Sequence, residues 1–462
     1  MTLNLWTRRS ALTALLASAA LLAGCALAPK TEAPPPIVFV HGNGDSAALW
    51  STTVWRFESN GWPRDRLHAI DLPYPLARDA DDKPQPGRTS TAEHMAYLSA
   101  EVDKVLARTG AKQVVLFANS RGGNAIRNYI ANGGGAAKVS HAILGGTPNH
   151  GVWSNPGFRP TNEFNGAGPF LTALNNQGAP GVEVTPGPKW MTIRSDHNDK
   201  FAQPDGVWIG AKGTPTNVTF AGPELKGAEN VVIPGIDHRE TSYGPQAFAA
   251  AYRFVTGRAP ATTEPVAESR VVLDGKVSGL GLDNDPTQGG FVTNLPLAGA
   301  TVEVYAVDAS TGERLGAAKH RRTVGADGRW GPFTAAPGQA YEFVVSAPGY
   351  ATTHIYRSPF ARSSDLVHLR AEVLAAADKD AGSVLTLTRP RGYFGLPRDT
   401  IVFDGRNPAP GIPTGVAGVA TSKLKLPAGP LRAVAAEFNG ERIVGRNWPA
   451  AENRVVFLEI HK

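Results

Sequence analysis

Residues 114–125 read VVLFANSRGGNA, and this stretch decides the fold of the first half of the chain. Its first four residues form an apolar run, which is typical of a strand buried on both faces of a parallel sheet. Small residues, Ala118 and Gly122, stand two positions before and after Ser120, as a sharp strand-to-helix turn requires. Such a turn lifts the serine hydroxyl above the sheet and aims the first N–H groups of the helix at developing negative charge. The stretch therefore predicts a nucleophilic serine.

Apolar runs and helix-like segments alternate on both sides of this turn. The run at 37–40 predicts another buried strand and leads into His41-Gly42-Asn43-Gly44, a turn that can offer backbone N–H groups near the serine. Apolar residues at helical spacing predict a helix over 91–108. Further strands are expected at 140–144, 189–194 and 230–234, and a closing helix at 248–255. This alternation predicts an α/β domain over residues 37–258.

Length and composition favour several domains, one of them rich in turns. The chain has 462 residues, of which 51 glycines and 37 prolines make about 19%, against roughly 12% in average proteins. The net charge of +6 is spread along the chain without a block of Lys or Arg, so no nucleic-acid partner is predicted. A single cysteine excludes an internal disulfide framework and a cysteine-based zinc site.

The N-terminus predicts export and a lipid anchor. Arg8 and Arg9 precede an apolar run at 11–23, which is too short to span a membrane. The following LAGC resembles a bacterial lipobox, which implies that residues 1–24 are removed and that Cys25 is acylated; a plain cleaved signal is the alternative. TRRSAL at the start of the signal resembles a twin-arginine signal. We therefore expect an envelope lipoprotein, periplasmic or at the outer membrane, or an extracellular protein.

Beyond the tether at residues 25–36 and the α/β domain, the character of the sequence changes once more. Residues 259–268 are rich in Pro, Thr and Glu and are expected to be an exposed linker. Short strand-like runs separated by turns then predict one or two all-β, sandwich-like domains, at 269–375 and 376–462. The stretch LPLAGATV at 295–302 resembles the opening of carboxypeptidase-regulatory-like or collagen-adhesin B-type modules.

A nucleophilic serine needs a base and an acid. The strand, turn and helix around Ser120 resemble the nucleophile turn of the α/β hydrolases, and this resemblance implies that the acid and then the histidine follow the serine along the chain, the histidine after the last strand. Of the eleven histidines, His238 fits this position, whereas His41 is expected to be structural and His150 to shape the pocket wall. The loop after strand 189–194 offers the two acids Asp196 and Asp199. Two other acids fit less well: Asp205, and Asp237, which is expected to face away.

Residues 35–258 resemble the α/β-hydrolase lipases, nearest to the minimal bacterial lipases and to an archaeal lipase type with a β-rich C-terminal region. Ala118 stands where the usual pattern has glycine, a departure shared by the small bacterial lipases. The resemblance covers about half the chain and rests on HGNG (41–44), ANSRG (118–122), GTPNHG (146–151), DKFAQP (199–204) and the later His238.

The resemblance implies a catalytic set. DKFAQP is similar to the stretch around the acid of many lipases, which favours Asp199 and leaves Asp196 as the alternative acid. Some lipases bind metal, but Asp283-Asn284-Asp285 is too short for a calcium loop and is interpreted as a solvated turn, so no metal and no cofactor are predicted. The implied set is the triad Ser120, Asp199 and His238, with the backbone N–H groups of Asn43 and Arg121 as the oxyanion hole.

The implied activity is hydrolysis of carboxylic esters or lipids through an acyl-enzyme. One alternative is a depolymerase of polyesters of the polyhydroxyalkanoate type, which uses the same chemistry. Another is a non-catalytic, surface-binding lipoprotein, although such a protein would be free to lose Ser120 or His238. Because every catalytic candidate precedes the linker, we also expect a fragment ending near Arg258 to fold alone and to act on small esters.

Overall fold

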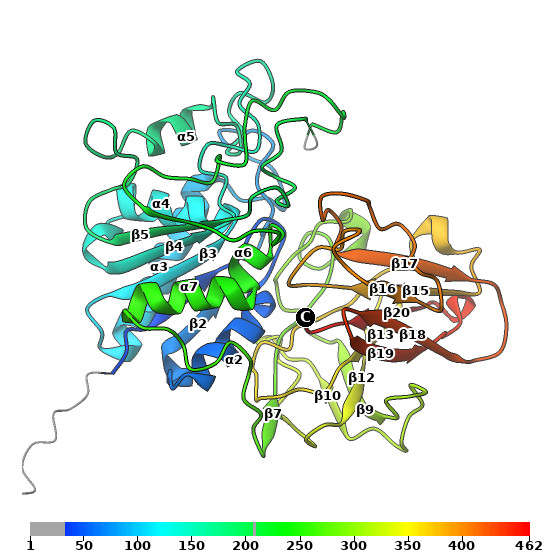
Figure 1. The fold of residues 1–462 in the computed structure, drawn as a ribbon. Coiled ribbons are helices and arrows are strands. Elements are labelled where there is room, and N and C mark those ends of the chain that lie inside the picture. Colours follow the sequence, from blue (N-terminus) through cyan, green and yellow to red (C-terminus); the bar gives the residue numbers. More distant parts are fainter. Residues whose placement is uncertain (1–32, 207–208) are drawn as a thin grey trace, which may run out of the picture. The chain divides into compact units, whose positions relative to one another are not determined.

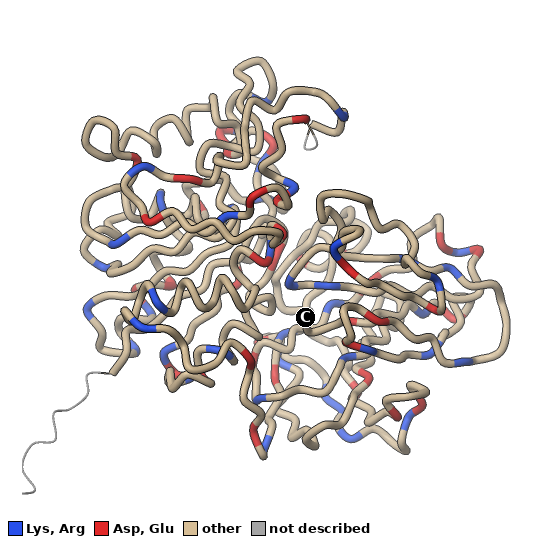
Figure 2. Tube along the Cα trace, in the orientation of Figure 1, with Lys and Arg blue, Asp and Glu red and all other residues tan. Residues whose placement is uncertain are grey.

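The computed structural model describes residues 33–206 and 209–462. The predicted export signal, the lipidation site Cys25 and most of the tether lie outside the described residues. Residues 35–462 form one compact unit. Within the described part of the chain, no helix is both long and apolar enough to span a bilayer. Figure 2 shows that basic and acidic residues are interspersed along the trace, as the sequence predicted.

The first half of the chain forms a six-stranded parallel sheet in the order β2-β1-β3-β4-β5-β6 (Figure 1). Its central strands are apolar throughout because helices bury both faces. The sheet with its helices confirms the predicted α/β fold class. The strands are β1 (Ile37–Val40), β2 (Leu67–Ile70), β3 (Val114–Asn119), β4 (Val139–Gly145), β5 (Lys189–Arg194) and β6 (Glu229–Val232).

Two pairs of helices cover the sheet. Helices α2 (Ser51–Ser59) and α7 (Pro245–Thr256) pack on one face, and α3 (Thr91–Thr109) and α4 (Arg121–Asn132) pack on the other. Helix α3 begins at a capping box, in which the Ser90 side chain accepts from the Glu93 N–H and the Glu93 side chain accepts from the Ser90 N–H. Two short helices, α5 (Pro169–Leu174) and α6 (Glu240–Tyr243), lie in the connections above the strands.

The second half of the chain is β-rich, as predicted, with one large sheet and three small ones. The large sheet has the order β10-β9-β12-β13-β20-β15-β17 and takes strands from both predicted β modules. Because β13 and β20 pair in parallel along their full lengths, the boundary predicted at residue 375 does not separate two sheets. The strands of the large sheet are β9 (Thr301–Val307), β10 (His320–Thr323), β12 (Ala340–Ser346), β13 (Thr352–Arg357), β15 (Ser383–Thr388), β17 (Thr421–Leu426) and β20 (Arg454–Glu459).

The small sheets close the region around the large one. Two of them are pairs that join distant parts of the chain, and the third is an antiparallel sheet of three strands. They are β7 (Val271–Leu273) with β11 (Phe333–Ala335), β8 (Val277–Ser278) with β14 (Leu369–Arg370), and β16 (Ile401–Phe403) with β18 (Ala433–Phe438) and β19 (Glu441–Arg446).

The β-rich region packs against the α/β domain, which corrects the expectation that few contacts join the two; the linker itself is exposed or half-buried, as predicted. Trp55 of α2 is buried in the core of the β-rich region, where its Nε1 donates to the Ser363 carbonyl at 2.9 Å. The next residue, Arg56, donates from Nε to the Thr263 carbonyl of the linker at 2.8 Å. Side chains of the first domain therefore complete the core of the second.

This packing reverses the expectation for a fragment that ends at Arg258. The cut uncovers Trp55 and the apolar surface around it, and exposed apolar patches of this kind cause aggregation. We now expect the fragment to be recovered mainly as insoluble protein, or to melt well below the full chain by circular dichroism. A soluble, monomeric fragment with the melting temperature of the full chain would contradict this.

Candidate active site

Ser120 lies at the sharp turn between β3 and α4 and has φ of 52°, in the left-handed region that side chains other than glycine rarely adopt. The turn is held from below, because the Ser120 N–H donates to the Gly145 carbonyl of β4 at 2.8 Å. A Cβ on Gly122 would lie 2.7 Å from the carbonyl oxygens of Val40 and His41, so only glycine fits there. The backbone is thus strained where the sequence predicted a nucleophile.

The predicted base and acid are in contact. Nδ1 of His238 lies 2.9 Å and 3.0 Å from the two carboxylate oxygens of Asp199. Each residue is 3% exposed, so little water competes for this contact. The Asp199 carboxylate also accepts from the Phe201 N–H at 2.9 Å, which fixes its orientation. With Nδ1 facing the carboxylate, Nε2 is the ring nitrogen left for a proton from another group.

Ser120 and His238 border the same small cavity. Its volume is about 70 Å³, little more than two water molecules occupy in the liquid. Among the described residues, the Ser120 hydroxyl makes no hydrogen bond; in free enzymes such catalytic contacts often tighten only when substrate binds. The other residues lining the cavity are Asn43, Asp45, Asn119, Val152, Phe164, Phe201 and Tyr393.

The structure places the other candidate acids away from His238. Asp196 Oδ1 accepts from the N–H groups of His197 and Gly235, at 2.6 Å and 3.0 Å, and so links its loop to the loop that follows β6. Asp205 is exposed and is not among the partners of His238 within the described residues. Asp237 is fully buried and faces the β-rich region.

The two residues predicted to supply the oxyanion hole flank the nucleophile. Asn43 borders the cavity, and its side chain is held in place because Oδ1 accepts from the Ala77 N–H at 2.7 Å. Arg121 is the first residue of α4, where a backbone N–H has no partner inside the helix. The Arg121 side chain is buried and forms an ion pair with Glu163, so it points away from the cavity. The backbone N–H is then the Arg121 group that can donate to a substrate oxygen.

The two other histidines of the motifs are structural here. His41 Nε2 accepts from the Leu72 N–H at 3.1 Å, and burial lowers the pKa of His41, which keeps the ring neutral. His150 contacts the Gly222 carbonyl and Glu183 and does not line the cavity, contrary to the pocket-wall role expected for it.

The described residues contain no group of three or more His, Cys, Asp or Glu side chains arranged to hold a metal ion. In the turn that was interpreted as solvated, Asp283 and Asp285 are exposed. Asn284 between them is buried, and its amide donates to the Leu295 and Pro296 carbonyls at 3.3 Å and 2.8 Å.

Sequence reasoning missed a wall of the cavity that comes from the β-rich region. Tyr393 follows β15, and the centre of its ring lies 6.5 Å from that of His238. Two cations flank the tyrosine: Lys200 Nζ lies 4.1 Å from the ring centre and the Arg239 guanidinium 4.9 Å. Burial, together with Arg239, lowers the pKa of Lys200 to about 8. Burial also raises the pKa of Tyr393 to about 12, so its hydroxyl stays protonated.

A second missed feature anchors the loop that carries His238. Arg389 Nη1 donates to the Asp237 carboxylate at 2.7 Å, and Nη2 forms an ion pair with Glu240, so Arg389 binds the chain both before and after His238. The Tyr393 N–H donates to the same Asp237 oxygen at 2.8 Å. Burial raises the pKa of Asp237, but the guanidinium groups of Arg389 and Arg398 outweigh it, and the net pKa lies below the ordinary value. Asp237 is therefore ionised and holds the His238 loop against the β-rich region. The sequence around Asp237 does not indicate which distant residues it contacts.

Two family profiles match the chain. Residues 35–170 match the family described as "alpha/beta hydrolase fold", and residues 269–374 match the "Lipase C-terminal domain". Among solved structures, the chain is similar to the Bacillus licheniformis lipase BlEst2 in its mature form, with 21% identity, 50% of this chain and 95% of that chain covered, and a TM-score of 0.37. The propeptide form of the same lipase covers 91% of this chain and 94% of its own, with 16% identity and a TM-score of 0.37. Aspergillus fumigatus lipase B has 14% identity and a TM-score of 0.36, with 52% and 56% covered.

Proposed function

We propose that this chain, a lipase/esterase-type α/β hydrolase with a lipase C-terminal domain, hydrolyses carboxylic esters through an acyl-enzyme on Ser120. The observation that carries the proposal is the 2.9 Å contact between His238 Nδ1 and Asp199 in the wall of the cavity that Ser120 borders. A serine at a strained turn beside a carboxylate-oriented imidazole is the arrangement that nucleophilic acyl transfer needs.

This geometry supports the following roles. His238 takes the Ser120 proton as the hydroxyl attacks the ester carbonyl, then gives it to the leaving alcohol and later activates water. Asp199 holds the ring with Nδ1 protonated and stabilises the imidazolium that forms. The backbone N–H groups of Asn43 and Arg121 donate hydrogen bonds to the carbonyl oxygen of the tetrahedral intermediate and stabilise its negative charge.

Cavity size argues for small acyl groups. A volume of about 70 Å³ accommodates a short acyl chain, whereas pockets for drug-sized ligands start near 300 Å³. Purified protein assayed on p-nitrophenyl esters from acetate to palmitate should therefore give its highest kcat/KM at two to four acyl carbons. Absence of hydrolysis across the whole series would overturn the proposal and favour a non-catalytic surface-binding protein. Release of monomers from polyhydroxyalkanoate film together with poor ester turnover would favour a depolymerase.

The site of action is also a proposal. The sequence of residues 1–25 supports export and acylation of Cys25, which would hold the hydrolase at a membrane of the cell envelope. Mass spectrometry of the native protein tests this, because lipidation predicts a modified N-terminal peptide that starts at Cys25.

The β-rich region acts on the catalytic loop as a positioning element. Replacing Arg389 with methionine leaves the buried Asp237 carboxylate without its 2.7 Å partner, so we expect the loop that carries His238 to shift. Misplacing a catalytic group by about 1 Å can cost on the order of 10² in rate. We expect kcat on p-nitrophenyl butyrate to fall about 10- to 100-fold with little change in KM.

Arg432→Met provides the matched control, because Arg432 pairs with Asp404 at the surface of the same region. It should leave kcat unchanged. Arg389→Lys keeps the charge and should restore part of the rate. If a folded Arg389→Met protein, checked by circular dichroism, has the wild-type kcat, the β-rich region does not position His238.

A further inference from the structure

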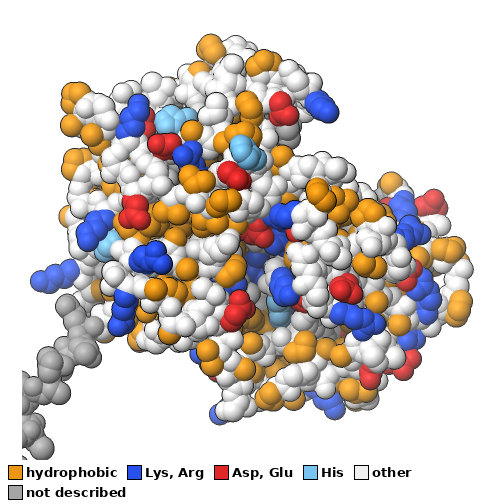
Figure 3. Space-filling model, in the orientation of Figure 1, with side chains coloured by type: hydrophobic (Ala, Val, Ile, Leu, Met, Phe, Trp, Pro, Cys, Tyr) orange, Lys and Arg blue, Asp and Glu red, His pale blue; other side chains and the backbone are white. Residues whose placement is uncertain are grey.

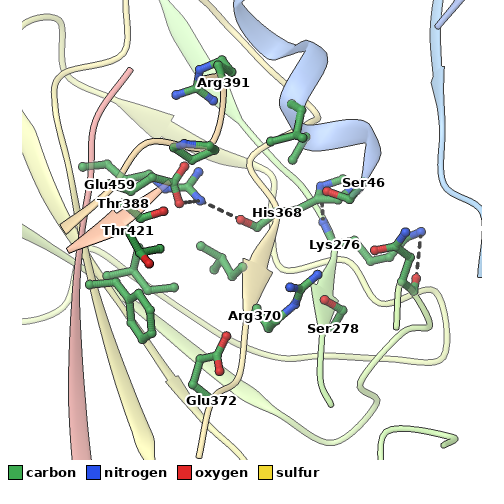
Figure 4. Close-up of a pocket in the computed structure, with 18 residues that line it drawn as sticks. Ser46, Lys276, Ser278, His368, Arg370, Glu372, Thr388, Arg391, Thr421 and Glu459 are labelled. Atoms are coloured by element: carbon green, nitrogen blue, oxygen red, sulfur yellow. Dashed lines mark hydrogen bonds and ion pairs between the residues drawn. The ribbon is translucent and has the colours of Figure 1, made fainter. Parts of the chain in front are cut away.

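A second cavity, larger than the one at Ser120, lies between the segment Ser46–Leu49 and strands of the β-rich region (Figure 4). Its volume is about 300 Å³, at the lower end of the range for small-molecule sites, which often occur where domains meet. It shares no lining residue with the cavity at Ser120. Figure 3 shows basic and acidic side chains gathered where the two regions meet. The proposed ester hydrolysis therefore does not explain this cavity.

Two arginines in its wall carry buried N–H donors that are unpaired within the described chain. They are the Nε groups of Arg357 and Arg370. Arg357 is only 6% exposed, and its Nη2 is engaged by the His368 carbonyl and by Glu459, at 2.7 Å and 2.8 Å. Buried donors are nearly always paired in folded proteins, so unpaired ones in a cavity wall are groups that a bound acceptor could pair; Arg78, Arg88, Arg194 and Arg239 carry an unpaired buried Nε in the same way.

Of the two arginines, Arg370 has fewer partners for its guanidinium group. Among the described residues its side chain makes no hydrogen bond or ion pair, and in Figure 4 no dashed line reaches it. It belongs to β14, where it pairs in register with Ser278 of β8, another residue of the cavity wall. A guanidinium group in such a wall offers parallel N–H donors that match a carboxylate or a phosphate.

The charges around the cavity favour an anion. Lys276 and Arg391 already have partners: Lys276 contacts Asp71 at 2.8 Å, and Arg391 donates to two backbone carbonyls. Burial raises the pKa of Glu372 and outweighs the charges of Arg370 and Lys423, which lower it. Besides His368, the lining holds four Lys and Arg side chains, Lys276, Arg357, Arg370 and Arg391, against two acidic ones, Glu372 and Glu459.

The remaining wall is partly apolar, with Leu49, Ile355 and Phe457 among its members. We propose that this cavity binds a small organic anion, with its carboxylate or phosphate group on Arg370 and Arg357 and its apolar part against these three side chains. An inorganic anion would leave the apolar wall uncovered, and a neutral alcohol would leave the guanidinium donors unpaired.

The test is isothermal titration calorimetry on the full chain with four probes that separate the two features. Hexanoate and hexyl phosphate carry both a tail and an anionic group, inorganic phosphate lacks the tail, and 1-hexanol lacks the charge. At least one of the two amphiphilic anions should bind at least tenfold more tightly than phosphate or hexanol, and the tighter one identifies the head group. Equal affinities for all four probes, or no binding of either amphiphilic anion, would overturn the proposal.

Location is tested with variants and with a crystal. Arg370→Gln should weaken binding of the tighter anion by about tenfold or more, since the variant loses the charge-assisted hydrogen bonds to the anionic group. Arg442→Gln, which removes an exposed arginine of β19 that does not line the cavity, should change nothing. A crystal soaked with the tighter anion gives a readout that does not depend on folding of the variant. Density beside Arg370 would support the site, and density at Ser120 alone would refute it.

Discussion

Replacing Ser120 with alanine is expected to lower kcat/KM on short-chain p-nitrophenyl esters by about 10⁴- to 10⁶-fold, because loss of a nucleophilic serine removes the covalent route. The fold should survive, since the Ser120 hydroxyl makes no hydrogen bond within the described chain and the turn is held by backbone contacts such as Ser120 N–H to the Gly145 carbonyl. Initial rates at enzyme concentrations adjusted over several decades, with circular dichroism melting curves, measure both effects.

Ser99→Ala is the matched control, because Ser99 lies on α3, away from the residues that line the cavity. It should keep the wild-type rate. A fluorophosphonate should label the wild-type protein on the peptide that contains Ser120 and should not label Ser120→Ala. Turnover by Ser120→Ala near the wild-type rate, or label on another serine, would assign the nucleophile elsewhere.

The central part of the α/β domain was predictable because its signals are local. The apolar run of β3 and the small residues around Ser120 are both imposed by a buried strand that must turn sharply into a helix. Strand β2 and helix α2 were missed, because LHAI (67–70) is short and mixed in polarity. STTVWRFES (51–59) begins with serine and β-branched residues, which favour a helix only weakly.

The contribution of the β-rich region to the site was not predictable, because it depends on contacts between distant segments. Arg389 meets Asp237 across 152 positions in the chain, and strand periodicity carries no information about such pairing. The same holds for the single sheet that joins β13 to β20, and for the burial of Trp55 in the core of the other region. Two regions that a Pro-rich linker separates in the sequence therefore pack as one unit.

The choice between Asp196 and Asp199 was left to a resemblance, and the structure now gives it a physical basis that an experiment can measure. Replacing Asp199 with asparagine is expected to lower kcat by about 10⁴-fold. The reason is that an amide NH₂ facing His238 Nδ1 donates a hydrogen bond where the carboxylate accepts one. The ring then favours the tautomer with its proton on Nε2, which cannot take the proton of Ser120, and the imidazolium loses its counter-charge.

Asp196→Asn tests the alternative at a nearly matched position, three residues earlier in the same loop. Asp196 Oδ1 accepts there from the backbone N–H groups of His197 and Gly235 and from the Ser195 hydroxyl, and an amide oxygen can accept the same hydrogen bonds, so kcat should change by less than about threefold. Measuring kcat and the melting temperature of both variants separates a lost catalytic role from a loosened loop, because a loosened loop would lower both quantities. A large loss of kcat in Asp196→Asn with a mild effect of Asp199→Asn would show that the imidazole turns to Asp196 during catalysis, and the assignment of the acid would pass to that residue.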